Sequence, residues 1–99
     1  MSEQKLRLAH IYLQQADVHR QKSELEPAIA AFTKAISLYK EMAKDEPAVW
    51  AIIADTIESV AATYKAAGEL DKASETLKEA AQLREQLVKV EQRARAEAE

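Results

Sequence analysis

The chain has 99 residues, which is enough for one domain and too few for two cores of ordinary size. Hydrophobic residues make up 47% of the chain and charged residues 31%, a balance that argues against intrinsic disorder. The net charge of -3 argues against nucleic acid as a partner, and the absence of cysteine excludes disulfides, thiolate metal sites and cysteine nucleophiles.

Turn-forming residues are rare, with one glycine and two prolines, whereas the strong helix formers alanine, leucine, glutamate, lysine and glutamine dominate. We therefore predict a few long helices and no sheet. Apolar residues recur with helical spacing in four segments, which are separated by breaks near positions 23, 45 and 68.

The four predicted helices follow one another in chain order. The first is predicted for residues 3–22, with Ser2 as its N-cap. Pro27 and Pro47 mark the starts of the second and third helices, because a proline in the first turn lacks only an N–H that has no intrahelical partner. Gly68 can adopt a positive φ and so ends the third helix. The fourth helix begins just after it.

The fourth helix is expected to extend past its neighbours, because Glu85 with Lys89 and Glu91 with Arg95 form favourable i, i+4 pairs. Each pair is weak, so residues 93–99 are expected to fray. An apolar seam continues into this part of the helix, and its predicted self-association residues are Leu87, Val88 and Val90.

Two parts of the sequence repeat at an offset of 45 residues, as Ala28 and Ala73 show (73 − 28 = 45). The same offset pairs Ala9 with Ala54, Ala16 with Ala61, Ala35 with Ala80, Leu38 with Leu83, Phe32 with Leu77, and His19 with Tyr64. Small residues at fixed positions let two antiparallel helices approach closely. We therefore predict two equivalent helical hairpins.

This pattern resembles the tetratricopeptide repeat, a helix–turn–helix unit with small and bulky residues at fixed positions. The second hairpin matches best, through Ala61, Tyr64, Gly68, Ala73, Leu77 and Ala80. In the first hairpin the matching residues are Tyr12, Ala16, Ala28, Phe32 and Ala35, whereas His19 replaces the aromatic residue and Ser23 the turn glycine. The offset of 45 residues exceeds the family's usual period of about 34, as in a long-helix variant.

The resemblance implies an all-α fold of two stacked antiparallel hairpins, a right-handed α-solenoid fragment with an extended C-terminal helix. We expect one domain over residues 1–99, with repeat one at residues 3–44, repeat two at residues 47–88 and the extension at residues 89–99. About three units are normally needed for a stable stack, and this chain supplies two. Its ends must therefore be covered by self-association, by a partner protein, or by the long fourth helix acting as a solvating cap.

The resemblance also implies that the first helix of each repeat lines a concave surface for a partner's peptide or helix. The residues carried over to that surface are His10, Leu13, Asp17 and Arg20 in the first repeat, and Asp55, Glu58, Ala62 and Lys65 in the second. Leu13 and Asp17 stand where one variant of the family grips a terminal carboxylate with lysine and asparagine, so that activity is not expected. The acidic side chains among these residues suggest either a basic or amphipathic ligand or a merely solvated face.

No combination of residues nominates a reaction. His10 and His19 are nine residues apart and fall on opposite sides of one helix, so they cannot share a metal ion. The sequence has no Gly-rich phosphate loop, nucleophile elbow, zinc motif or calcium loop. We therefore expect a non-enzymatic protein without a cofactor or a metal.

Two functions remain open at this point: a module that binds a partner protein, and a structural protein whose surfaces are occupied by its own copies. In either case we expect a homodimer or a subunit of a complex. The sequence starts without the apolar core of a signal peptide and has no apolar stretch of about 20 residues, so we expect a cytoplasmic protein that does not enter a membrane.

Overall fold

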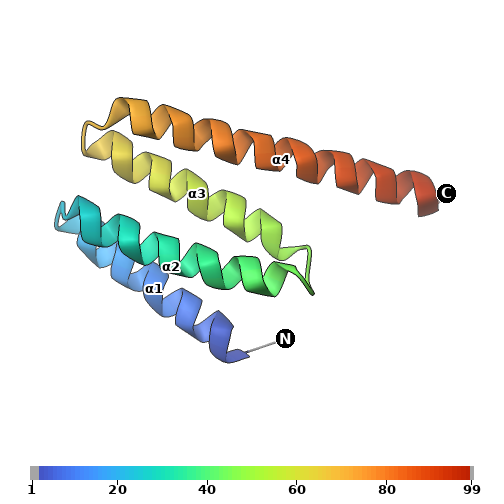
Figure 1. Cartoon of the computed structure of the whole chain (residues 1–99), viewed down its shortest axis with the longest axis horizontal. Coiled ribbons are helices and arrows are strands. Elements are labelled where there is room, and N and C mark those ends of the chain that lie inside the picture. Colours follow the sequence, from blue (N-terminus) through green and yellow to red (C-terminus); the bar gives the residue numbers. More distant parts are fainter. Residues whose placement is uncertain (1–2, 99) are drawn as a thin grey trace.

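The computed structural model describes residues 3–98. In this part of the chain all regular structure is α-helical, as predicted, in the helices α1 (Glu3–Gln21), α2 (Leu25–Ala43), α3 (Val49–Ala66) and α4 (Leu70–Ala98). Consecutive helices lie antiparallel, so that α1 with α2 and α3 with α4 form two hairpins, and α2 packs against α3 (Figure 1). The molecule is a flat slab with extents of 50 × 33 × 15 Å.

The prolines behave differently at the two helix starts. Pro27 lies in the first turn of α2, as predicted. The predicted start of the third helix at Pro47 is wrong, because α3 begins at Val49. Pro47 lies instead in the preceding turn, where the Val49 N–H donates to the Glu46 carbonyl at 3.0 Å. The predicted N-cap, Ser2, lies outside the described residues.

The turns inside the two hairpins have the same backbone geometry. Ser23 has φ 61° and Gly68 has φ 80°, and these residues are 45 apart (68 − 23 = 45). In each turn the following N–H donates to a carbonyl five positions earlier at 2.9 Å, from Glu24 to His19 and from Glu69 to Tyr64. Both helices therefore end in the same left-handed cap, which is the structure that Gly68 alone predicted.

Exchanging the two turn residues is expected to shift stability in opposite directions. Ser23→Gly should raise the free energy of unfolding by about 0.5–1 kcal/mol, because a side chain at positive φ is strained. Gly68→Ser should lower it by a similar amount, although a Cβ at Gly68 would meet no atom within 4 Å. Urea denaturation measures both changes. A shift of both variants in the same direction would contradict the conclusion that Ser23 and Gly68 occupy the same left-handed cap.

The alanines paired by the offset are all buried. None of them exposes more than 5% of its surface: Ala9, Ala16, Ala28 and Ala35 in the first hairpin, and Ala54, Ala61, Ala73 and Ala80 in the second. Small side chains at these positions let the helix backbones come close. The predicted equivalence of the hairpins is thus confirmed at its small positions.

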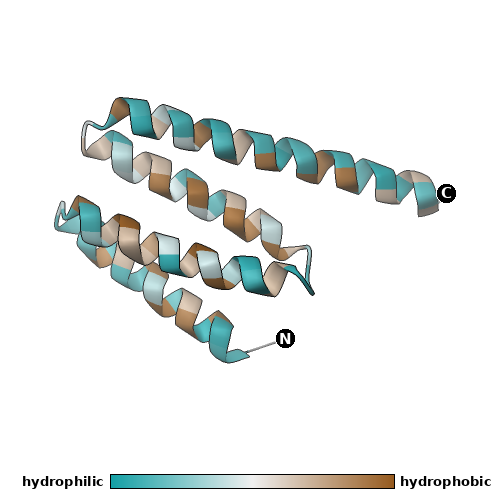
Figure 2. Ribbon diagram, in the orientation of Figure 1, coloured by the Kyte–Doolittle hydropathy of each residue, from teal (hydrophilic) through white to brown (hydrophobic). Residues whose placement is uncertain are grey.

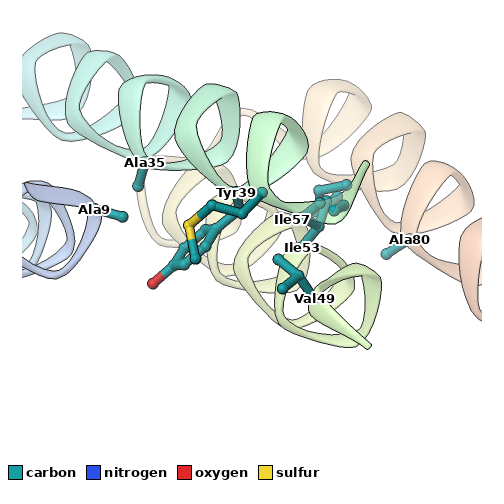
Figure 3. Packing of buried hydrophobic residues seen from close by; sticks show 9 residues of the cluster. Ala9, Ala35, Tyr39, Val49, Ile53, Ile57 and Ala80 are labelled. Atoms are coloured by element: carbon teal, nitrogen blue, oxygen red, sulfur yellow. The ribbon is translucent and has the colours of Figure 1, made fainter. Parts of the chain in front are cut away.

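Larger side chains fill the space between the hairpins. Tyr39 of α2 lies in one cluster with Val49 and Ile53 of α3, and Tyr39 and Ile53 are the largest fully buried side chains of the described residues (Figure 3). Phe32 of α2 and Val60 of α3 belong to a second cluster. The core therefore includes the contact between α2 and α3 and stacks the two hairpins.

Helix α4 extends well past the other helices. Val88 is the offset counterpart of Ala43, the last residue of α2, and α4 continues as a helix for ten residues beyond it to Ala98 (98 − 88 = 10; Figure 1). The ion pairs predicted for this segment are present, with 3.6 Å between the charged atoms of Glu85 and Lys89 and of Glu91 and Arg95.

Candidate functional site

A groove of about 250 Å³ lies on the surface between α1 and α3. It is lined by Leu13 and Asp17 of α1, Phe32 of α2, and Ile52, Asp55, Thr56 and Ser59 of α3. Apolar side chains and two carboxylates thus meet in one surface depression. The first helix of each hairpin contributes to it, as the sequence predicts for a binding surface.

The structure brings only part of the predicted binding set together. Leu13, Asp17 and Asp55 share the groove. Arg20 lines a neighbouring hollow at the end of α1. Lys65 lines a different surface depression, between α3 and α4. The other members, His10, Glu58 and Ala62, line none of these three depressions, and His10 and Ala62 are exposed.

The predicted acidic side chains are held by arginines of the same chain. Arg84 of α4 donates two hydrogen bonds of 2.8 Å to the two carboxylate oxygens of Glu58, and a further one to Asp55. This bidentate pair lowers the pKa of Glu58 below its usual range and raises that of Arg84, with the hydrogen bonds as the main cause. Asp17 pairs with Arg20 at 3.2 Å within α1.

These pairs make the surface around the groove much less acidic than its carboxylates suggest. Three carboxylates, Asp17, Asp55 and Glu58, are paired with two arginines, Arg20 and Arg84, so the local net charge is −1 (2 − 3 = −1). All five side chains remain at least 40% exposed, so water screens their fields. This surface therefore carries one excess negative charge, close to α4.

Arg84 was not among the predicted site residues, although a comparison of the two repeats distinguishes it. Its offset counterpart is Tyr39 (84 − 45 = 39), while the counterparts of Asp55 and Glu58 are His10 and Leu13. At the positions where the second hairpin has an arginine and two carboxylates, the first hairpin has a tyrosine, a histidine and a leucine. This simultaneous change at three positions was the sequence signal that could have predicted the pairing of Arg84 with Asp55 and Glu58.

Ile52 was also missed, and it supplies much of the apolar character of the groove. Its side chain is 40% exposed. Its offset counterpart is Arg7, so this position is not part of the shared hairpin core. The difference between Ile52 and its charged counterpart was therefore a signal in the sequence that Ile52 does not belong to the packing residues.

His19, which stands in the aromatic position of the first hairpin, joins α1 to the start of α2. Its Nδ1 lies 2.8 Å from a carboxylate oxygen of Glu24. This hydrogen bond is the main cause of the lowered pKa of Glu24. His19 therefore connects the two helices at their turn, away from the groove.

Two other kinds of functional feature are metal sites and membrane-spanning helices. Among residues 3–98 no group of three or more histidine, aspartate or glutamate side chains is arranged to hold a metal ion. None of the helices in the same range has the length and apolar character needed to cross a membrane.

One comparison with known proteins finds a match, and it lies in the first hairpin. The family model of the tetratricopeptide repeat matches residues 9–42. No curated protein and no solved structure gives a significant match to the chain. The match spans the usual period of about 34 residues, so the extra residues of the 45-residue offset are residues 43–53, at the connection from α2 to α3. The match does not cover the second hairpin, which the sequence predicted to be the better fit.

Proposed function

We propose, from the premise that residues 9–42 place this chain in the tetratricopeptide repeat family, that it is a non-enzymatic module that binds a segment of a partner protein on its concave face. Tetratricopeptide repeats generally mediate protein–protein interactions. The observation that carries the proposal is the groove between α1 and α3, in which apolar side chains lie beside carboxylates.

The groove fits an amphipathic segment of the partner. Leu13, Phe32 and Ile52 offer an apolar surface for one or two apolar side chains. The excess negative charge of the cluster formed by Asp55, Glu58 and Arg84 favours a basic residue on the same segment. An amphipathic helix with an apolar stripe and a flanking lysine or arginine meets both requirements.

A terminal carboxylate is a poor fit for this groove. The positions at which the resemblance would require a lysine and an asparagine hold Leu13 and Asp17. A ligand carboxylate would meet the Asp17 carboxylate, which is already paired with Arg20. We therefore infer that the partner contributes an internal segment. The two carboxylates of the groove, Asp17 and Asp55, are both ion-paired, so we give neither a catalytic role.

Selection from a displayed library of random 16-residue peptides tests the proposal. Binders of the unmodified chain should be enriched in peptides with helically spaced apolar residues and a nearby lysine or arginine. Ile52→Glu should weaken their binding by about tenfold or more, because it puts a charge into the apolar part of the groove. Fluorescence anisotropy of the selected peptides measures the change.

The matched control is Val90→Glu, which changes an exposed apolar residue on the extension of α4. Its peptide affinity should equal that of the unmodified chain. Selected peptides that lose affinity equally with both variants, or with neither, would contradict binding in the groove.

A further inference from the structure

The two outer helices, α1 and α4, expose apolar side chains whose counterparts at the 45-residue offset are buried. Eight large hydrophobic residues are exposed among residues 3–98, and five of them are offset counterparts of a buried residue. These pairs are Leu8 with Ile53, Ile11 with Thr56, Val18 with Thr63, Leu77 with Phe32, and Val88 with Ala43. The exposed positions are therefore those that packing between hairpins buries inside the chain.

The buried counterparts lie where the hairpins meet. Ile53 of α3 shares a core cluster with Tyr39 and Ala43 of α2. Thr56 lines the groove together with Phe32, and Thr63 lines the neighbouring hollow together with Leu25. The face of α3 with Ile53, Thr56 and Thr63 thus packs on the first hairpin.

The same two faces recur, uncovered, at opposite ends of the molecule. We call Leu8, Ile11 and Val18 of α1 the head face, because they correspond to the packed face of α3. We call the α4 residues Leu70, Leu77, Ala81 and Val88 the tail face, because they correspond to Leu25, Phe32, Ile36 and Ala43 of α2. The first three tail-face positions lie on one side of α4, and Leu70, Leu77 and Ala81 line a single surface depression. Figure 2 shows such separated hydrophobic positions along the otherwise hydrophilic α4.

We propose that the head face of one copy of the chain docks on the tail face of a second copy, as α3 docks on α2 within one copy. The partner that covers each face is a second copy of this chain, because the chain contains both sides of such an interface. Inside one copy they already pack together once, where α3 packs on α2. Residues 89–98 do not turn back over the tail face, since α4 continues through them to Ala98, whereas α2 ends at Ala43, the position equivalent to Val88.

The side chains that would meet between copies are complementary in size. Inside the chain the large Phe32 and the smaller Thr56 line the same groove. Between copies a smaller Leu77 would face the larger Ile11, so the total volume is similar. Exchanges that conserve volume are the ones that cores tolerate best. The head face is also more apolar than the corresponding face of α3, because Ile11 and Val18 replace two threonines.

The charges at the edge of this contact are compatible with it. Glu24 and Ala67 line one hollow inside the chain, and their counterparts between copies are Glu69 and Lys22, which carry opposite charges. Arg84 would occupy the place of Tyr39, but it is already paired with Glu58, so it brings no unpaired charge. The contact between copies should be weaker than the one inside the chain, because a paired arginine replaces a buried tyrosine.

This contact differs from a symmetric dimer. The head and tail faces are different surfaces, so two docked copies leave one of each free and further copies can add. Val90, which the sequence suggested for self-association, lies beyond the tail face, whereas Val88 lies within it. Ile52 and Asp55 are in neither face, so the assembly would leave each concave groove open. It would therefore display several grooves on one particle, which favours multivalent binding.

Mixing two blocked variants tests the proposal by sedimentation velocity. The unmodified chain should form species that grow with concentration. Leu77→Glu blocks the tail face and Ile11→Glu blocks the head face, so each variant alone should sediment as a monomer, with association weakened by about tenfold or more. A mixture of the two should form a dimer of one copy of each, because one intact head face and one intact tail face remain.

The alternatives give different outcomes. A monomeric unmodified chain at about 100 μM, or a mixture of the variants that stays monomeric, would overturn the proposal. Loss of assembly in Val90→Glu would overturn it too, since that would place the contact on the extension of α4. Circular dichroism checks that the variants fold. Val18→Glu and Val88→Glu form a second pair of blocked variants, with the same expected result, if either of the first pair does not fold.

Discussion

Replacing Tyr39 by alanine is expected to lower the free energy of unfolding by about 3–5 kcal/mol, the cost of removing a buried aromatic side chain. Tyr39 exposes 1% of its surface and lies in the cluster with Ile53 that joins the hairpins. The same burial raises the pKa of its hydroxyl group. Loss of this side chain leaves a cavity between α2 and α3. Guanidinium denaturation followed by circular dichroism measures the change.

The matched control for Tyr39→Ala is Arg84→Ala at the equivalent position of the second hairpin. Arg84 is 40% exposed and held by ion pairs, so its removal should cost less than about 1 kcal/mol. Equal losses in the two variants would contradict the assignment of Tyr39 to the contact between hairpins. Tyr39→Phe keeps the ring and should stay close to the unmodified chain, which separates loss of packing from loss of the hydroxyl group.

Enlarging a small residue between helices is expected to have the second largest effect. Ala16→Leu should lower the free energy of unfolding by about 1–3 kcal/mol, because a larger side chain does not fit in a fully packed site. Ala16 has no exposed surface and belongs to the cluster with Phe32 and Val60. The helix propensities of alanine and leucine are similar, so the change reports packing. Thermal or urea unfolding measures it.

Ala30→Leu is the control for Ala16→Leu, because Ala30 is an exposed residue of α2. Its stability should remain within about 0.5 kcal/mol of the unmodified chain, as for most surface substitutions. A destabilisation of Ala30→Leu as large as that of Ala16→Leu would show that the close helix approach at Ala16 is not what limits side-chain size.

The helices and their pairing follow from local and periodic signals. Pro47 and Gly68 lie in two of the three breaks between helices, and buried alanines at a constant offset identify the hairpins. The positive φ of Ser23 could not be predicted from the residue type alone. A serine does not by itself indicate a positive φ, but its register with Gly68 does. Pro47 shows another limit, since a proline fits a turn before a helix as well as the first helical turn.

The candidate site could be predicted only in part. Leu13, Asp17 and Asp55 were found because the first helix of each repeat lines the groove. The partners of the acidic residues were not found, because Arg84 is separated from Glu58 by 26 residues and from Asp55 by 29, and a pair across two helices has no period. Charges counted along one helix therefore overestimated the acidity of the surface.

The stacking of two equivalent hairpins is the claim on which both proposals depend, and nuclear Overhauser contacts of the Phe32 ring test it most directly. Cross-peaks are expected from the ring protons to the methyl groups of Ala16, in the same hairpin, and of Val60, in the other hairpin. Cross-peaks to Ala16 without any to Val60 would show hairpins that form but do not stack. That result would contradict both the groove between α1 and α3 and the head-to-tail contact that repeats the same packing between copies.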